Sequence, residues 1–160
     1  DVYKRQDMMK QILKVMIAAA LMFGAWSCDN TPEEEPIPEI EVTTNNLSGS
    51  WRLSLWNDQS LPEGSFVYID FMRADGTYTM YQNIDSFGTR TLTGRFTLYV
   101  DEEIGAAVLR GNYDHGAGEW NHRYIVESLT ASTMLLVAKD NAEDRCLYER
   151  CEIPAEIIGE

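Results

Sequence analysis

The stretch FVYIDFMRADGTYTMYQN, residues 66–83, predicts the fold. In its first half Val67, Ile69 and Phe71 alternate with more polar residues, so they share one face of an extended strand. An Asp-Gly pair at 75–76 then separates this run from a second alternating run, and Asp-Gly is the strongest short hairpin signal. The stretch therefore predicts an antiparallel β-hairpin.

Similar short runs, separated by Gly, Asp, Asn and Ser clusters, recur on both sides of this hairpin from Leu47 onward. In the first of them Trp51, Leu53 and Leu55 are expected to share one face. No stretch carries a 3.6-residue apolar stripe over three turns, so little helix is expected outside the tail after Pro154. Eight strands are predicted, at residues 49–56, 66–73, 77–83, 90–99, 106–113, 121–128, 133–139 and 145–153.

Eight consecutive hairpin-linked strands, each with one apolar face, predict an all-β fold. The expected architecture is a small eight-stranded up-and-down antiparallel barrel, which leaves no edge strand exposed. The domain is expected to span residues 47–154, with a tail at 155–160. The interior of such a barrel is filled by side chains or holds one small ligand.

The chain in front of this domain has the features of a secretory signal at residues 8–27. Lys10 and Lys14 precede an apolar run that is shorter than the roughly 20 residues that span a bilayer, and small residues follow it. Residues 1–7 precede two candidate start methionines and begin with DVYKRQ, which resembles a translated sequencing adapter. We expect residues 1–7 to be an artefact and exclude them from functional reasoning.

The end of this signal, Ala25-Trp26-Ser27-Cys28, resembles the lipobox of bacterial lipoproteins. The resemblance implies that Cys28 is acylated and becomes the mature N-terminus, since more than one acyl chain gives stable anchoring. The acidic run at 33–35 resembles the export signal of Bacteroidetes surface lipoproteins, although a solvated spacer explains it equally well. The expected location is the cell envelope, as an outer-membrane lipoprotein that faces the periplasm or is surface-exposed.

Residues 28–46 are expected to form this lipid anchor and an acidic flexible linker, because Pro, Glu and Asn dominate them. The whole chain has 13 basic and 26 acidic residues. Removal of residues 1–27, which hold four basic and two acidic residues, leaves nine basic and 24 acidic residues and a net charge of −15. Such a surface repels phosphate backbones, so no nucleic-acid partner is expected.

Four motifs of the domain resemble the lipocalin-like lipoproteins of Bacteroidetes: LSGSW (47–51), FMRADGTY (71–78), TGRF (93–96) and LRGNY (109–113). The resemblance implies that Trp51 packs at the closed end of the barrel with an arginine, Arg150 or Arg145, stacked on its indole. The long helix that the family carries before its last strand is missing, which implies a reduced barrel.

Two functions remain open at this stage. The first, which the resemblance favours, is to bind a small apolar ligand inside the barrel. The second is to bind or inhibit a protein or glycan partner through the outer surface or the loops, because an acidic surface can steer toward basic partners. The residues expected to line a ligand site are Leu53, Ile69, Phe71, Tyr78, Phe96, Leu98 and Tyr124.

The residue types that carry catalysis or bind metals form no recognisable constellation. His115 and His122 match no metal-ligand spacing, and a polar hairpin loop explains them. Cys146 and Cys151 lie about 16 Å apart in an extended strand, whereas a disulfide needs Cα atoms within about 7 Å. Two thiols are therefore favoured, although a turn in this segment would permit a bridge. No enzymatic activity, cofactor or metal is predicted.

Overall fold

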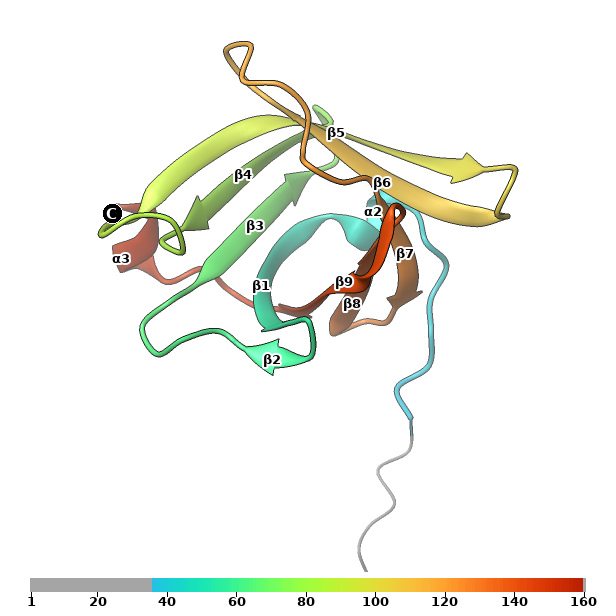
Figure 1. Ribbon diagram of the computed structural model, residues 1–160, viewed down its shortest axis with the longest axis horizontal. Coiled ribbons are helices and arrows are strands. Elements are labelled where there is room, and N and C mark those ends of the chain that lie inside the picture. Colours follow the sequence, from blue (N-terminus) through green and yellow to red (C-terminus); the bar gives the residue numbers. More distant parts are fainter. Residues whose placement is uncertain (1–35, 160) are drawn as a thin grey trace, which may run out of the picture. The chain divides into compact units, whose positions relative to one another are not determined.

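A computed structural model describes residues 36–159 of the chain, and residues from Ile37 onward form one compact unit (Figure 1). The predictions for the signal peptide, for Cys28 and for residues 1–7 lie outside the described residues.

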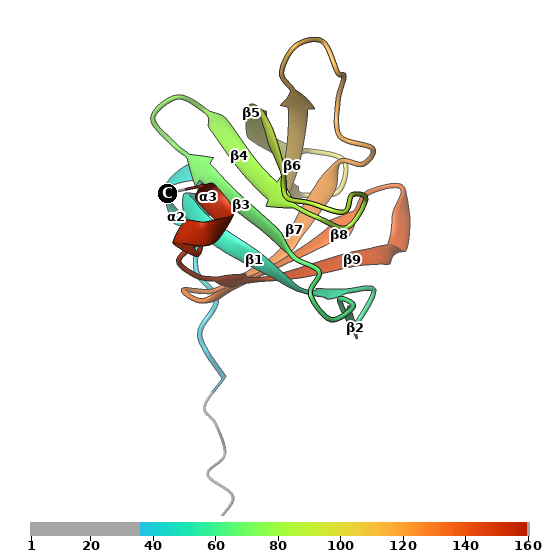
Figure 2. The same cartoon turned by 90° about the vertical axis from the view of Figure 1, so that its left-hand side faces the viewer.

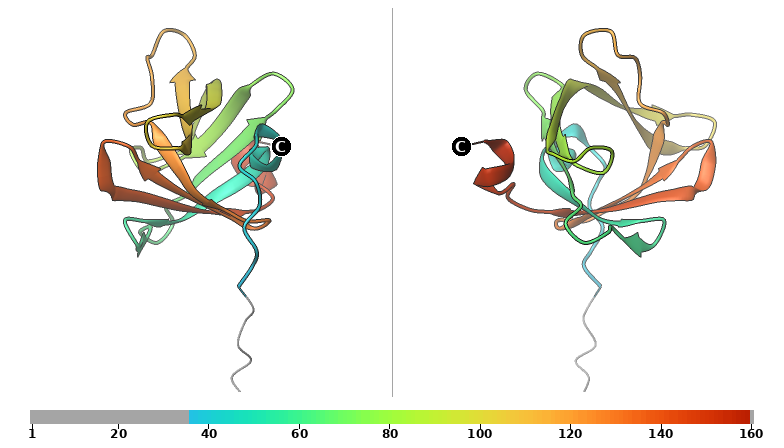
Figure 3. Two further views of the ribbon diagram at one scale, coloured as in Figure 1. Left: turned by 90° about the vertical axis from the view of Figure 1, so that its right-hand side faces the viewer. Right: turned by 60° about the vertical axis from the view of Figure 1, so that its left-hand side comes forward.

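The fold is a closed antiparallel β-barrel of eight strands, and the predicted fold class is confirmed (right-hand view of Figure 3). Strand β1 pairs with β3, each strand from β3 to β8 pairs with the next, and β9 pairs back with β1 to close the ring. A two-residue strand, β2, pairs with β1 alone. The strands are β1 (Gly49–Trp56), β2 (Gln59–Ser60), β3 (Val67–Met72), β4 (Thr77–Gln82), β5 (Arg90–Asp101), β6 (Ala106–Tyr113), β7 (Tyr124–Leu129), β8 (Thr133–Ala138) and β9 (Asn141–Arg150).

The described residues contain two helices of four residues each, α2 (Thr44–Leu47) and α3 (Ala155–Ile158). Helix α3 follows Pro154, where the sequence predicted the exception to the β pattern, and lies outside the ring of strands (right-hand view of Figure 3). Helix α2 was not predicted. No helix within residues 36–159 has the length and apolar character to cross a membrane.

The boundary of the domain lies earlier than the predicted start at Leu47. The backbone N–H of Ile40 donates to the carbonyl of Leu129 at 2.8 Å, and Ile40 and Val42 pack against the core. The Thr43 hydroxyl accepts from the N–H of Asn46 and caps α2. Residues 39–46 are therefore part of the barrel unit. Although this stretch is rich in Pro and Glu, its two apolar side chains, Ile40 and Val42, pack against the barrel core.

The expectation that Leu55 continues the inward row of β1 is wrong. The register between β1 and β9 shifts between Leu53 and Leu55, so that Leu53 pairs with Tyr148 and Leu55 pairs with Leu147. Directly paired residues share a face, and Leu147 lies between two residues that face inward. The extra residue of this β-bulge therefore turns Leu55 to the outer face.

One end of the barrel is closed by Trp51, whose side chain is completely buried. Its indole N–H donates to the carbonyl of Leu47 at 2.8 Å. Arg150 lies over the indole, with its Cζ atom 4.0 Å from the ring centroid, and donates to the carbonyls of Asn46, Ser48 and Ala131 at 2.8–3.0 Å. This is the stacking that the resemblance implied, and Arg150 supplies it.

Gly49 leaves the space that this arginine occupies. Its φ is +107°, and a Cβ atom at this position would lie 2.9 Å from Arg150 Nη1. Arg145, the other arginine considered for the stacking, bonds instead to Glu127, with 3.2 Å between its Nη1 and the carboxylate oxygen Oε2. The glycine and the tryptophan of the Gly49-Ser50-Trp51 motif thus act together, one by leaving room and the other by filling the barrel floor.

Candidate functional site

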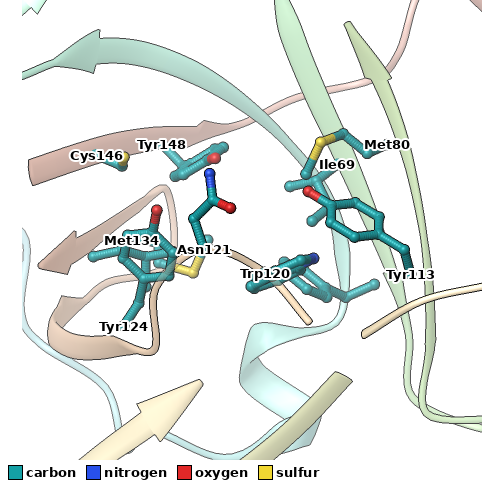
Figure 4. Close-up of a pocket in the computed structure, with 11 residues that line it drawn as sticks. Ile69, Met80, Tyr113, Trp120, Asn121, Tyr124, Met134, Cys146 and Tyr148 are labelled. Atoms are coloured by element: carbon teal, nitrogen blue, oxygen red, sulfur yellow. The ribbon is translucent and has the colours of Figure 1, made fainter. Parts of the chain in front are cut away.

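An apolar cavity of about 130 Å³ lies inside the barrel. Strands β3, β4 and β6–β9 supply most of its wall, and the loop between β6 and β7 supplies the rest (Figure 4). The lining residues are Ile69, Phe71, Met80, Tyr113, Trp120, Asn121, Tyr124, Met134, Leu136, Cys146 and Tyr148.

The β6–β7 loop reaches the cavity because it folds back along β6. The N–H of Tyr113 donates to the carbonyl of Gly118, and the N–H of Trp120 donates to the carbonyl of Gly111, both at 2.8 Å. The loop tip projects beyond the ring of strands (Figure 2), while Trp120 and Asn121 turn toward the cavity (Figure 4). The end of the barrel opposite Trp51 is thus partly covered by the loop itself.

The indole of Trp120 is held in place by an aromatic cluster. Its N–H donates to the Tyr78 hydroxyl at 2.8 Å, and the two rings meet edge to face with their centroids 5.1 Å apart. Tyr113 and Tyr124 add further edge-to-face contacts, with Tyr78 and with Trp120 respectively. Such pairs contribute about 0.5–1.5 kcal/mol each beyond the area they bury, so the indole has a defined position.

Gly111 is required at the point where Trp120 crosses β6. A Cβ atom on Gly111 would lie 2.2 Å from Trp120 Cε2. We expect Gly111→Ala to displace the indole, break its bond to Tyr78 and lower the free energy of unfolding by about 1–3 kcal/mol. Urea denaturation measures this. In a Trp120→Ala background the same change should cost far less, and an equal cost in both backgrounds would show that Trp120 is not the obstacle.

The electrostatic character of the cavity is neutral, since none of the lining residues carries a charge at pH 7. Burial raises the pKa of the Cys146 thiol to about 12 and moves the pKa values of Tyr124 and Tyr148 well above their ordinary range. Burial also raises the pKa of Tyr78 to about 12. All four groups therefore keep their protons at neutral pH, and the hydroxyls of Tyr124 and Tyr148, which line the cavity, can donate hydrogen bonds to a ligand.

The same shifts predict a loss of stability at alkaline pH. In the unfolded chain Cys146, Tyr124 and Tyr148 ionise near their ordinary pKa values, about 9 for cysteine and 10 for tyrosine. The folded state holds these protons more tightly, so its stability is complete below about pH 8 and decreases as the pH rises from 9 toward 12. Urea denaturation at pH 8 and pH 10.5 should show the decrease, and Cys146→Ala should reduce it. Equal stability at the two pH values would contradict the burial of these groups.

The structure brings three of the seven predicted ligand residues together: Ile69, Phe71 and Tyr124 line the cavity. The other four lie elsewhere in the barrel wall or core. Phe96 packs edge to face on Phe71, and Tyr78 is completely buried under Trp120. Leu53 and Leu98 belong to the core or pack against it without reaching the cavity.

The sequence reasoning missed the residues that the last strands and the loop contribute. Met134 and Tyr148 follow from the same alternation rule, because they pair with each other and Tyr148 pairs with Leu53. Trp120 and Asn121 had no such signal, since they stand in a loop whose path depends on its pairing with β6. Alternation along the strands could therefore have identified the cavity residues of the strands, but it gives no information about the residues of the loop.

His122, one of the two histidines of the chain, lies between two carboxylates. Its Nδ1 lies 2.7 Å from Asp140 Oδ1 and its Nε2 lies 3.4 Å from Asp144 Oδ2. Within residues 36–159, no group of three or more His, Cys, Asp or Glu side chains is placed to hold a metal ion. Cys146 and Cys151 are free thiols, Cys146 in the cavity wall and Cys151 beyond the end of β9.

A closed eight-stranded up-and-down barrel is the architecture of the lipocalins, and in this chain it encloses an apolar cavity. The chain thus has a lipocalin-like barrel fold.

The sequence matches no protein family and no curated protein. Two solved structures resemble it. A lipocalin-like protein from Bacteroides uniformis is 16% identical over 66% of this chain and 99% of that chain, with a TM-score of 0.49. Bovine odorant-binding protein, solved in complex with a selenium-containing odorant, is 15% identical over 76% of this chain and 81% of that chain, with a TM-score of 0.37. The strand pairing by itself defines the barrel fold.

Proposed function

We propose that the protein is a non-enzymatic, envelope-anchored binding protein that holds one small ligand inside its barrel. The observation that carries the proposal is the cavity itself: about 130 Å³ of space, walled by apolar and aromatic side chains with a few polar groups among them. Small-molecule sites have this composition. A protein of this size would otherwise fill its barrel with side chains.

The ligand can be tested on a form of residues 28–160 in which Cys28→Ser replaces the acylated residue and every described residue is kept. The protein is purified from bacteria without detergent and analysed by native mass spectrometry. A discrete added mass, lost on mild activation, is expected and would identify the ligand. A bare mass that persists after incubation with small apolar compounds would overturn the proposal.

The envelope anchor at Cys28 is a separate part of the proposal, supported by the lipobox resemblance and the signal features before it. Cells that express the full chain should incorporate labelled palmitate into the protein and retain it in the membrane fraction. Cys28→Ala is expected to abolish both. Cys151→Ala serves as the matched control, because it removes a free thiol of the barrel unit and should change neither.

A second candidate function, binding of a protein or glycan partner, is favoured by one loop. Ile84 and Phe87, between β4 and β5, both expose their side chains, and Phe87 is fully exposed. Aromatic side chains, including phenylalanine, are enriched in protein interfaces relative to the rest of the surface. Phe87→Ser should then weaken capture of a partner from envelope extracts without changing the stability of the barrel. An unchanged capture would remove this loop from consideration.

A further inference from the structure

The Tyr148 hydroxyl is a polar group that the fold leaves without a partner. Tyr148 lies on β9 with 8% of its surface exposed, and its hydroxyl makes no hydrogen bond to any residue in 36–159. Every fully buried side-chain nitrogen or oxygen atom of the described residues does have a hydrogen-bond partner. The hydroxyl is therefore not sealed in the core, and because Tyr148 lines the cavity, that is the space it faces (Figure 4).

Other uncharged polar groups face the same space. The hydroxyls of Tyr113 and Tyr124 likewise have no hydrogen-bond partner among the described residues, and the Asn121 amide lies between the rings (Figure 4). Asp144, two residues before Cys146 on β9, accepts a hydrogen bond from Trp56 at 3.0 Å and lies 3.4 Å from His122 Nε2. An anionic ligand would find no cation in this wall, and burial of an unpaired charge is costly.

The volume of the cavity limits the size of the ligand. A dry apolar cavity of about 150 Å³ is known to hold benzene, and the cavity here is about 130 Å³. A single ring fits within the cavity on this scale, whereas a long acyl chain would extend out of the partly covered end of the barrel.

We propose that the cavity takes a neutral molecule of about one ring that carries a hydrogen-bond acceptor, and that Tyr148 selects this ligand by donating its hydroxyl proton to the acceptor. The inference deepens the proposed function and depends on it. It assigns Tyr148 as the residue that sets specificity, and it excludes carboxylate-bearing lipids as the preferred ligands.

The test compares phenol with toluene, two molecules of the same shape of which only phenol has an acceptor. Their affinities are measured by calorimetry or NMR for the Cys28→Ser form of residues 28–160, with and without Tyr148→Phe. A net hydrogen bond is worth about 0.5–1.5 kcal/mol, so we expect Tyr148→Phe to weaken phenol binding about 3- to 10-fold and to leave toluene binding unchanged. Tyr68→Phe is the control, because Tyr68 alternates with the inward-facing Ile69 and does not line the cavity.

The outcomes distinguish ligand selection by Tyr148 from ligand binding in general. Equal effects of Tyr148→Phe on phenol and toluene would overturn the selection by Tyr148 and leave the binding function standing. Binding of benzoate as tight as that of phenol would overturn the preference for neutral ligands. Failure of both phenol and toluene to bind the unmodified barrel would count against the binding function itself.

Discussion

Trp51→Ala is expected to lower the free energy of unfolding by about 3–5 kcal/mol, the usual cost when a buried tryptophan is truncated. The substitution empties the barrel floor, removes the hydrogen bond to Leu47 and leaves the Arg150 guanidinium without the ring beneath it. Since domains of this size are stable by only about 5–15 kcal/mol, the loss is a large part of the total. Urea or thermal denaturation measures it.

Trp56→Ala is the matched control, because Trp56 ends the same strand. Its side chain is 42% exposed and makes one exposed hydrogen bond, to Asp144. We expect this change to cost no more than about 1 kcal/mol. Similar costs for the two substitutions would mean that Trp51 is not the plug of the barrel, and that the likeness of the Gly-x-Trp motif to the lipocalin signature is superficial.

Cys146→Phe is expected to abolish ligand binding, with a loss of at least about 100-fold in affinity, because the new ring would occupy the cavity that Cys146 now lines. Overfilling a core costs about 1–3 kcal/mol, so the barrel should remain folded. The affinity for toluene measures the effect. Cys146→Val, a smaller change at the same position, should give a partial loss and covers the case in which the phenylalanine variant does not fold.

Cys151→Phe is the control for this prediction. Cys151 is the other thiol of the barrel unit, follows the end of β9 and does not line the cavity. Its substitution should leave toluene binding unchanged. If toluene bound equally well to the Cys146→Phe and Cys151→Phe variants, the ligand would have to sit somewhere other than the barrel interior.

The barrel could be predicted from the sequence because its strands repeat one simple rule. Alternation with period two and turn residues such as Asp75-Gly76 place eight strands, and β1 and β6 have the predicted ends. The rule fails where the pairing partner decides the geometry. The bulge between Leu53 and Leu55 depends on the register against β9, and nothing in the local alternation marks it.

The site was less predictable than the fold, for a related reason. Alternation identifies which residues face inward, but it does not say which inward side chains pack together and which leave space. Phe96 and Tyr78 face inward but do not line the cavity, because Phe96 packs against Phe71 and Tyr78 packs against Trp120. Met134 and Tyr148, in contrast, line the cavity. The position of Trp120 depends on a glycine at 111 that has meaning only once the loop lies across β6.

Binding of a small ligand in the barrel cavity can be tested by a ¹H–¹⁵N NMR titration with toluene. The indole N–H signals of Trp120, in the cavity wall, and of Trp56, outside it, are followed in the Cys28→Ser form of residues 28–160. If the ligand binds in the cavity, we expect a saturable shift of the Trp120 signal and no shift of the Trp56 signal. An unchanged Trp120 signal, or an equal drift of both signals, would contradict binding in the cavity.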